Sequence, residues 1–110
     1  MNMKYLSRPE ELVLLAIWKI EDESYGVNIR NFVSELTGKY WSVGSIYVPL
    51  DRLENKGFLR SKLSQPTPER GGKSKRYYEI TKEGLKELEE IRKIYLAAWE
   101  NMPNISAKKA

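Results

Sequence analysis

The pattern of apolar and polar positions along the chain predicts a mostly helical protein with one hairpin. Apolar side chains recur at spacings of three and four in four stretches, and this period is typical of amphipathic helices over residues 8–20, 25–36, 43–56 and 82–102. From residue 58 to 63, and again from 75 to 80, the pattern alternates and predicts two strands. A proline- and glycine-containing stretch separates them, so we expect a hairpin with a long tip. The short segment 39–41, which contains Tyr40 and Trp41, predicts one further short strand.

Residues at the helix ends support these boundaries. Ser7 and Glu10 have the spacing of a capping box at the start of the first helix, which is apolar almost all round and therefore needs cover on several sides. Ser24 is the expected N-cap of the second helix, and Gly38 is its expected stop. Ile29, Val33 and Leu36 should point inward from that helix. Gly26, in the first turn of the second helix, indicates a close approach by either a neighbouring helix or a phosphate backbone.

The third helix, 43–56, has two different sides. Ile46, Leu50 and Leu53 share one face and should enter a core. The other side carries small or polar residues apart from one valine: Gly44, Ser45, Val48, Asp51, Arg52 and Asn55. Such a face suits insertion into the DNA major groove, which is about 12 Å wide. An ordinary surface helix has the same pattern. Tyr47 lies at the margin, and suits packing as well as contact with a ligand.

Pro49 complicates the start of this helix because proline removes an interior hydrogen bond. Either Ser42 or Ser45 can serve as the cap. We expect a late start at Ser45, which would place Pro49 near the first turn, or a bend at Pro49.

Composition excludes several classes of protein. A chain of 110 residues has the length of one domain, and it contains neither cysteine nor histidine. Thiolate or imidazole metal sites and the usual general base are therefore absent from the sequence. Gly71 and Gly72 precede a strand and not a helix, so they do not form a phosphate-binding loop. We expect no enzyme, no cofactor and no metal site. Neither a signal peptide nor a membrane span is predicted, which indicates a soluble cytoplasmic protein.

Charge is concentrated in one segment. The formal net charge is +4, whereas residues 60–76 contain six bases and one acid. The hairpin tip contributes little to a core, so its charge is available for a polyanion such as the DNA backbone.

The order helix, helix, short strand, helix, hairpin is that of a winged helix-turn-helix, and the predicted fold class is mainly α with a small β-hairpin (α+β). The sequence also resembles the PadR family of transcriptional regulators. The resemblance rests on Ser24-Tyr25-Gly26, on Gly44-Ser45-Ile46-Tyr47 with the following Arg52-Leu53-Glu54 and Gly57, and on the run from Gly71 to Gly84. It spans residues 10 to 100, and Pro49 departs by one position from the proline often found in this helix of the family.

The resemblance implies a DNA-binding regulator, a repressor acting as a homodimer on an inverted-repeat operator. It implies that the recognition helix contacts DNA through Ser42, Ser45, Tyr47 and Arg52, and the wing through Arg70, Lys73 and Lys75. Arg76 shares a strand face with Tyr78 and suits pairing within the domain. The alternative is a winged-helix module that binds protein and not DNA, and salt dependence of binding distinguishes the two.

The last helix, capped by Thr81, has an apolar stripe that is longer than the small domain requires. In the family this helix forms the dimer, often against the first helix. The stripe and expected dimer interface comprise Leu85, Leu88, Ile91, Tyr95, Trp99 and Met102. Some members bind hydrophobic or phenolic effectors near this interface, where Trp18, Tyr95 and Trp99 would line a pocket unless they are plain core. We therefore expect a DNA-binding domain at 1–80 with its wing at 58–80, a dimerisation helix at 81–103, and a flexible tail at 104–110.

Overall fold

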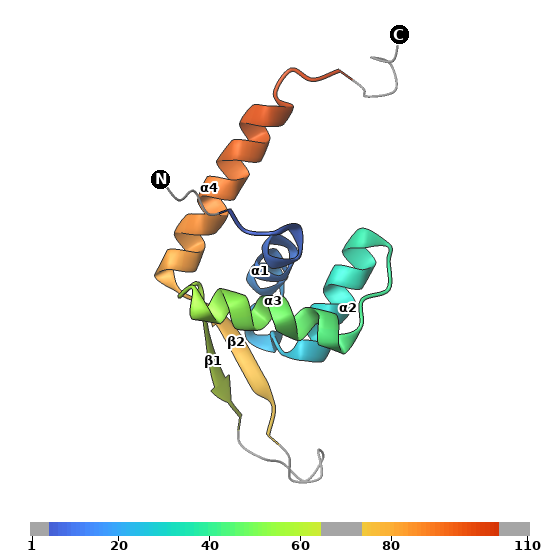
Figure 1. The fold of residues 1–110 in the computed structure, drawn as a ribbon, viewed down its shortest axis with the longest axis vertical. Coiled ribbons are helices and arrows are strands. Elements are labelled where there is room, and N and C mark those ends of the chain that lie inside the picture. The colour runs from blue at the N-terminus through green and yellow to red at the C-terminus, as the bar shows by residue number, and fades with distance from the viewer. Residues whose placement is uncertain (1–4, 65–73, 104–110) are drawn as a thin grey trace.

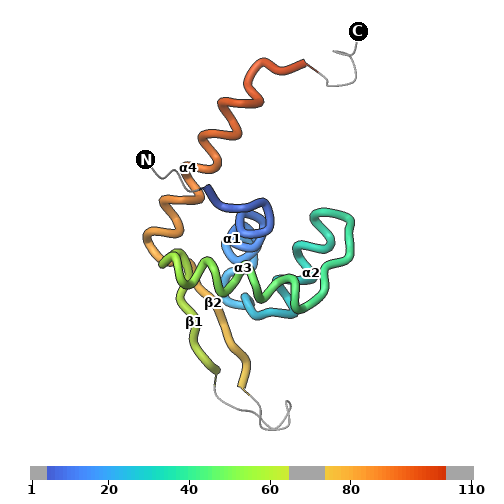
Figure 2. The backbone as a smooth tube through the Cα atoms, viewed as in Figure 1, coloured from blue at the N-terminus to red at the C-terminus, as the bar shows by residue number. Residues whose placement is uncertain are grey.

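The computed structural model describes residues 5–64 and 74–103. Three helices form the core, a two-stranded antiparallel hairpin follows, and a fourth helix ends the fold (Figure 1). The elements are α1 (Arg8–Ile20), the 3-10 turn η1 (Glu21–Glu23), α2 (Gly26–Thr37), α3 (Val43–Asn55), β1 (Leu59–Leu63), β2 (Arg76–Ile80) and α4 (Lys82–Trp99). The hairpin and α4 leave the three-helix core in opposite directions (Figure 2). The predicted fold class is confirmed.

The core lies where α1, α2 and α3 meet, and the hairpin closes it from one side. Its buried apolar side chains are Leu6, Val13, Leu14, Ala16, Ile17, Ile29, Val33, Ile46, Leu50, Leu53, Leu59 and Tyr78. The inward face predicted for the third helix is thus confirmed. Each Val, Leu or Ile side chain fully buried in this way contributes about 1.5–3 kcal/mol relative to exposure.

The capping box at the start of α1 is present and extends into a tertiary contact. The Ser7 hydroxyl accepts from the Glu10 N–H at 3.3 Å, and the Ser7 N–H donates to the Glu10 carboxylate at 2.7 Å. The Lys56 ammonium at the end of α3 reaches the same carboxylate at 3.0 Å. Burial acts to raise the pKa of Glu10, but the Ser7 N–H and Lys56 outweigh it and hold that pKa below its ordinary value. One carboxylate therefore caps α1 and ties it to α3.

The predicted start of the second helix is wrong in detail. Ser24 is fully buried, and its hydroxyl donates to the carbonyls of Glu21 at 2.7 Å and Ile17 at 3.3 Å, so it serves the end of α1. The N-cap of α2 is Tyr25, which makes no side-chain capping hydrogen bond. Gly38 ends the helix in a left-handed conformation, as expected. Leu36 is 52% exposed, contrary to prediction, because the last turn of α2 carries it away from the core cluster.

The strand expected at residues 39–41 does not form. Side chains of α2 satisfy the polar groups of Trp41 instead: Ser34 accepts from its N–H, and Arg30 donates to its carbonyl oxygen. The extra strand-like pairing occurs elsewhere, as an isolated bridge between Tyr25 and Tyr77.

The third helix starts at Val43, so the late start at Ser45 is wrong. The Ser42 hydroxyl accepts from the Ser45 N–H at 3.1 Å and provides the cap. Pro49 lies inside the helix on its buried side. Its ring is removed from water there, while its missing N–H leaves the helix one hydrogen bond short.

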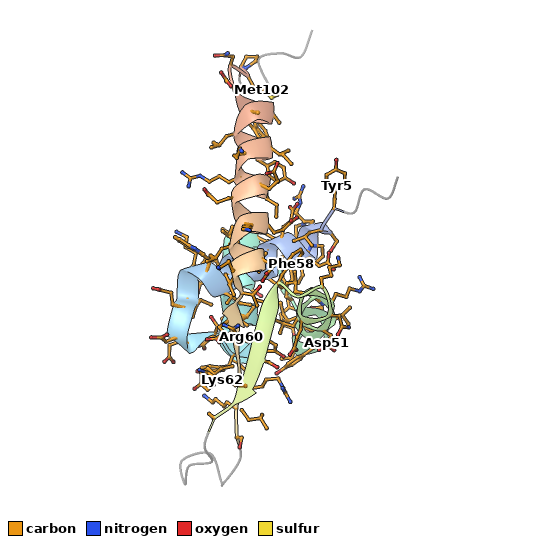
Figure 3. All side chains as sticks on the ribbon, turned by 90° about the vertical axis from the view of Figure 1, so that its left-hand side faces the viewer. Tyr5, Asp51, Phe58, Arg60, Lys62 and Met102 are labelled. Carbon is orange, nitrogen blue, oxygen red and sulfur yellow. The ribbon has the colours of Figure 1, made fainter. Side chains whose placement is uncertain are left out.

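The hairpin pairs Leu59 with Ile80 at its base and Leu63 with Arg76 at the far end of the described strands. Thr81 caps α4 through the Gly84 N–H, as predicted. The helix ends at Trp99, short of the predicted Met102, because Glu100 adopts an extended conformation. Leu88 and Ile91 of α4 pack against the core cluster, and side chains project all around this helix (Figure 3).

Candidate nucleic-acid interface

The outer face of α3 is open to solvent along its whole length. Its exposed residues are Val43, Gly44, Ser45, Tyr47, Val48, Asp51, Arg52 and Asn55. With α1 and α2 packed on its other face, the helix presents small and polar groups that a groove could receive.

The two serines at the start of α3 are joined to each other. The Ser45 hydroxyl donates to the Ser42 carbonyl oxygen at 2.7 Å, while the Ser42 hydroxyl accepts from the Ser45 N–H. Both side chains are exposed. Each hydroxyl oxygen retains acceptor capacity, so this helix start can accept a hydrogen bond from a ligand.

Tyr47 combines packing with exposure. A Cβ added to Gly26 would collide with the Tyr47 hydroxyl and lie 2.9 Å from Tyr47 Cζ, so the ring fills the space that the glycine leaves. The close neighbour of Gly26 is therefore α3. Tyr47 is still 39% exposed, which leaves an edge of the ring accessible on the outer face.

Arg52 is exposed in the last turn of α3, and it forms no ion pair with any residue that the structure describes. Its guanidinium therefore keeps its donors available. Arg76, in contrast, is engaged inside the domain: it donates to the Ser61 hydroxyl at 3.0 Å, which in turn donates to Glu54 at 2.7 Å. These two hydrogen bonds join the hairpin to α3, and they confirm that Arg76 pairs within the domain as expected. The Arg60 side chain is paired with Glu79 at 2.9 Å.

Lys75 lies just before β2, where the described part of the hairpin begins. Its ammonium is 3.8 Å from the centre of the Tyr25 ring. Arg70 and Lys73, the other two wing residues predicted from the sequence, lie outside the described residues.

Sequence reasoning missed a second cluster at the turn between α2 and α3. Arg30 donates to the Trp41 carbonyl oxygen at 3.2 Å and stacks 5.6 Å from the centre of the exposed Tyr40 ring. The Trp41 indole N–H donates to Thr37 at 3.0 Å. These contacts fix the turn that leads into the Ser42 cap. The sequence gives no signal of this cluster, because Arg30 is a lone arginine in α2 and its partners, Tyr40 and Trp41, come from the turn.

A sequence comparison shows which family this arrangement belongs to. The transcriptional regulator PadR-like family matches residues 13–90, which include the larger part of α1, all of α2, α3 and the hairpin, and the first half of α4. The chain belongs to the PadR family. Members are DNA-binding transcription regulators and not enzymes, so the open face of α3 and the hairpin belong to a DNA-binding regulator.

Solved structures of PadR-family regulators share the fold. A PadR-like transcriptional regulator from Bacillus cereus is 27% identical with a TM-score of 0.67, over 81% of this chain and 82% of that one. A PadR-family regulator from Clostridium difficile is 27% identical with a TM-score of 0.66, over 84% of this chain and 90% of that one. RosR from H. salinarum, at 20% identity, shows the likeness of fold alone, with a TM-score of 0.70 over 93% of this chain and 84% of that one. No match was found among curated proteins.

A groove of about 650 Å³ runs between α1 and α4 of this PadR-family chain. Its apolar lining comprises Leu12, Leu15, Trp18, Leu85, Leu88 and Ile91, with Tyr95 at one end. The Tyr95 hydroxyl donates to Glu11 across the groove at 3.1 Å, and this hydrogen bond raises the pKa of Tyr95. Of the three aromatic residues expected around an effector, Trp18 and Tyr95 line this groove and Trp99 does not.

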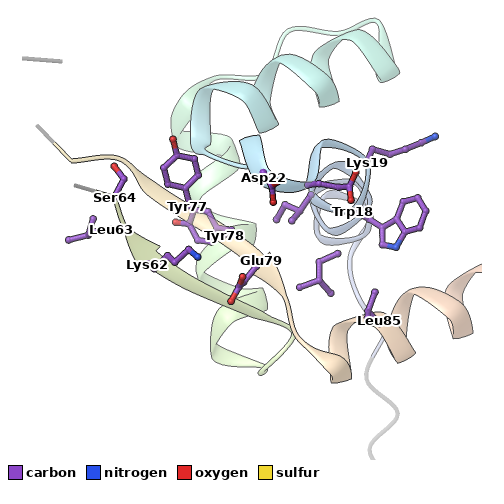
Figure 4. Close-up of a pocket in the computed structure, with 13 residues that line it drawn as sticks. Trp18, Lys19, Asp22, Lys62, Leu63, Ser64, Tyr77, Tyr78, Glu79 and Leu85 are labelled. Atoms are coloured by element: carbon purple, nitrogen blue, oxygen red, sulfur yellow. The ribbon is translucent and has the colours of Figure 1, made fainter. Parts of the chain in front are cut away.

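A second hollow of about 700 Å³ lies between the end of α1 and the hairpin (Figure 4). Its lining mixes Trp18, Tyr77 and Leu85 with charged side chains such as Lys19 and Lys62.

Among residues 5–64 and 74–103, no helix is long and apolar enough to cross a bilayer.

Proposed function

We propose that this PadR-family regulator is a repressor that binds an inverted-repeat operator as a homodimer. The observation that carries the proposal is the placement of α3, whose inner face is buried in the core while its outer face is exposed beside the hairpin. A helix supported in this way can enter the major groove with the wing against the flanking backbone.

On α3, the assigned DNA contacts are Ser42, Ser45, Tyr47 and Arg52. The Ser45 hydroxyl already donates to the Ser42 carbonyl, so towards DNA it serves as an acceptor, for example from a base amino group. Arg52, which forms no ion pair with a described residue, supplies donors suited to guanine or phosphate oxygens. On the wing, Lys75, Arg70 and Lys73 supply charge for phosphates, which sets affinity and position and not sequence preference.

The second copy is proposed to cover the apolar groove between α1 and α4. Trp18 is 52% exposed and Leu85 is 45% exposed in the single chain, although both border this groove. Such a continuous apolar surface is typical of an interface between subunits. The interface would comprise Leu85, Leu88, Ile91, Tyr95, Trp99 and Met102, with α1 of the partner as cover. Two-fold symmetry would then set two α3 helices about one DNA turn apart.

The experiment that tests this function is fluorescence anisotropy with a labelled duplex from upstream of the gene, against a scrambled duplex, over a series of salt concentrations. We expect tight, sequence-dependent binding with a log–log salt slope of about −0.9 per phosphate neutralised. Replacing Arg70, Lys73 and Lys75 together with Ala should flatten that slope. A matched variant that replaces Lys19, Lys86 and Lys93 removes the same charge elsewhere and should change the slope less.

Two results would contradict the proposal. Equal affinity for both duplexes would remove sequence-specific recognition. No binding even at low salt would favour the winged-helix module that binds protein. Repression itself is tested with a reporter gene placed behind the same upstream segment. Expression of the reporter should fall when the protein is supplied, and mutation of the operator should abolish this fall.

We also propose that a hydrophobic or phenolic effector binds beside the dimer interface. Trp18 and Tyr95 line the apolar groove between α1 and α4, which is the groove that the second copy is proposed to cover. Titrating candidate aromatic compounds should then quench or shift Trp fluorescence with saturation. A linear response without saturation for every compound would contradict an effector site there.

A further inference from the structure

The contact between Lys75 and Tyr25 joins the wing to the start of α2. We propose that Tyr25 is a positioning residue for DNA binding: its ring holds the Lys75 ammonium in place for a backbone phosphate. This inference rests on the proposed DNA-binding function and assigns Tyr25 a role within that same interface.

The Lys75 ammonium lies over the ring face. At 3.8 Å from the centroid it is well within the roughly 6 Å over which a cation is attracted to an aromatic face. The main chain at Lys75 is held as well, because its N–H donates to the Ser64 hydroxyl at 2.9 Å and its carbonyl oxygen accepts from the Ser64 N–H at 2.7 Å. Both ends of this lysine are therefore fixed before any ligand arrives.

Tyr25 itself is held by β2. Its main chain forms a bridge with Tyr77, and the Tyr78 N–H donates to the adjacent Ser24 carbonyl oxygen at 2.9 Å. The Tyr25 and Tyr77 rings meet edge to face, with centroids 5.5 Å apart and planes at 77°. This geometry is a favoured arrangement of aromatic rings. The platform for Lys75 is thus part of the joint between α2 and the hairpin.

The charge of Lys75 is not neutralised inside the described structure. Its ammonium forms no ion pair with any described carboxylate, whereas Arg60 on the same hairpin is paired with Glu79. A cation on an aromatic face keeps its outer side free for an anion. A DNA phosphate is the partner that the proposed function supplies.

Holding the lysine before binding reduces the conformational entropy that DNA binding would otherwise cost, since a lysine side chain has many rotamers to lose. Removal of the ring should therefore weaken DNA binding only while Lys75 is present. A role of Tyr25 in stability alone would weaken binding to the same extent with or without Lys75.

The first measurement needs no DNA. The Lys75 Hε protons, assigned by the signal missing from Lys75→Met, should be shifted upfield by the Tyr25 ring current in a ¹H–¹³C spectrum. The shift should persist in Tyr25→Phe, which keeps the ring, and disappear in Tyr25→Leu. Tyr25→Met, whose flexible thioether still packs against Tyr77, serves as a second ring-free variant if Tyr25→Leu does not fold. Unshifted Lys75 signals in the wild-type protein would overturn the contact.

The second measurement is a double-mutant cycle in duplex affinity. We expect Lys75→Met and Tyr25→Leu each to weaken binding by about 5- to 10-fold, and the double variant to bind no more weakly than Lys75→Met alone. Lys75→Met should also flatten the salt slope by about 0.9. Lys62, an exposed lysine on β1, is the matched control: Tyr25→Leu should have its full effect in a Lys62→Met background.

Two further outcomes decide the proposal. If Tyr25→Leu weakens binding equally with and without Lys75, Tyr25 does not act through Lys75 and the inference is overturned. If the wild-type protein binds no duplex at any salt concentration, the proposed function fails and the DNA role of Tyr25 fails with it, although the ring-current shift would still establish the contact.

Discussion

The hydroxyl of Tyr47 lies against Gly26, in space that a Cβ at that position would occupy. Gly26 is in the first turn of α2 and Tyr47 is in α3, so the two helices approach each other through this contact. The position of the proposed recognition helix relative to α2 therefore depends on a residue without a side chain.

Gly26→Ala should destabilise the protein by about 1–3 kcal/mol, because the added methyl group forces Tyr47 to move. Urea unfolding followed by circular dichroism measures this change. The cost should fall in a Tyr47→Leu background, since the shorter side chain no longer reaches position 26. An equal cost in both backgrounds would show that the collision lies elsewhere.

Gly44 provides the control for Gly26→Ala. It lies in α3, and a Cβ added there would have no neighbouring atom within 4 Å, so the methyl group of alanine meets open space. Gly44→Ala should stabilise the protein by up to about 1 kcal/mol, because alanine is the better helix former. Destabilisation by this substitution would mean that helix propensity does not control α3 at this point.

The ion pair between Glu10 and Lys56 predicts a dependence of stability on pH. The folded-state pKa of Glu10 lies below its ordinary value of 4.5, so the folded protein binds fewer protons than the unfolded chain near that pH. The stabilisation is complete above about pH 4.5 and is lost as the pH falls through the folded-state pKa. The difference in unfolding free energy between wild type and Glu10→Gln should therefore shrink on acidification from about pH 6 to about pH 3.

Lys56→Met tests the same pair from the other side. Glu10 is 3% exposed, and loss of its partner leaves a buried carboxylate without a cation. Because Lys56 is itself 36% exposed, the expected cost is about 1–3 kcal/mol, less than for a fully buried pair. Unchanged stability at pH 7 would contradict a stabilising role for this ion pair.

Tyr78 predicts a loss of stability in alkali. Burial in the core, with a smaller contribution from Tyr47, raises the pKa of Tyr78 to about 12 from an ordinary value of 10.0. Above pH 10 the unfolded chain loses the phenolic proton while the folded protein keeps it, so stability should fall between about pH 10 and 12. Tyr78→Phe should reduce that fall, as measured by urea unfolding at fixed pH values. An unaltered alkaline profile would show that other groups cause it.

The elements of the fold could be predicted because each has a strong local signal. The apolar face of α3 and the caps at Ser7 and Thr81 depend on residues a few positions apart. The sequence places Ser24 wrongly because a serine before a helix has the same local pattern whether it caps that helix or the preceding one. Only the burial of Ser24 against Ile17 distinguishes the two.

The candidate site was less predictable because its geometry depends on residues distant in sequence. An alternating pattern identified the hairpin, and charge identified Lys75. Nothing local indicated that Tyr25 would lie beneath Lys75, or that the strand-like pairing would involve Tyr25 and not residues 39–41. Those contacts arise when the hairpin folds back onto the start of α2.

The apolar groove between α1 and α4 leads to a prediction about the subunit interface. Leu85→Glu places a charge in the lining of the groove, and Leu85 is exposed enough in the single chain for its fold to tolerate the change. We expect the dimer dissociation constant to rise by at least about 10-fold, since an unpaired carboxylate would be buried between subunits. Sedimentation equilibrium measures this dissociation constant directly.

Lys86→Glu, at the exposed neighbouring position, is the control and should leave the dimer intact. Equal effects of both substitutions would point to net charge as the cause, and a monomeric wild-type protein would contradict the proposed homodimer.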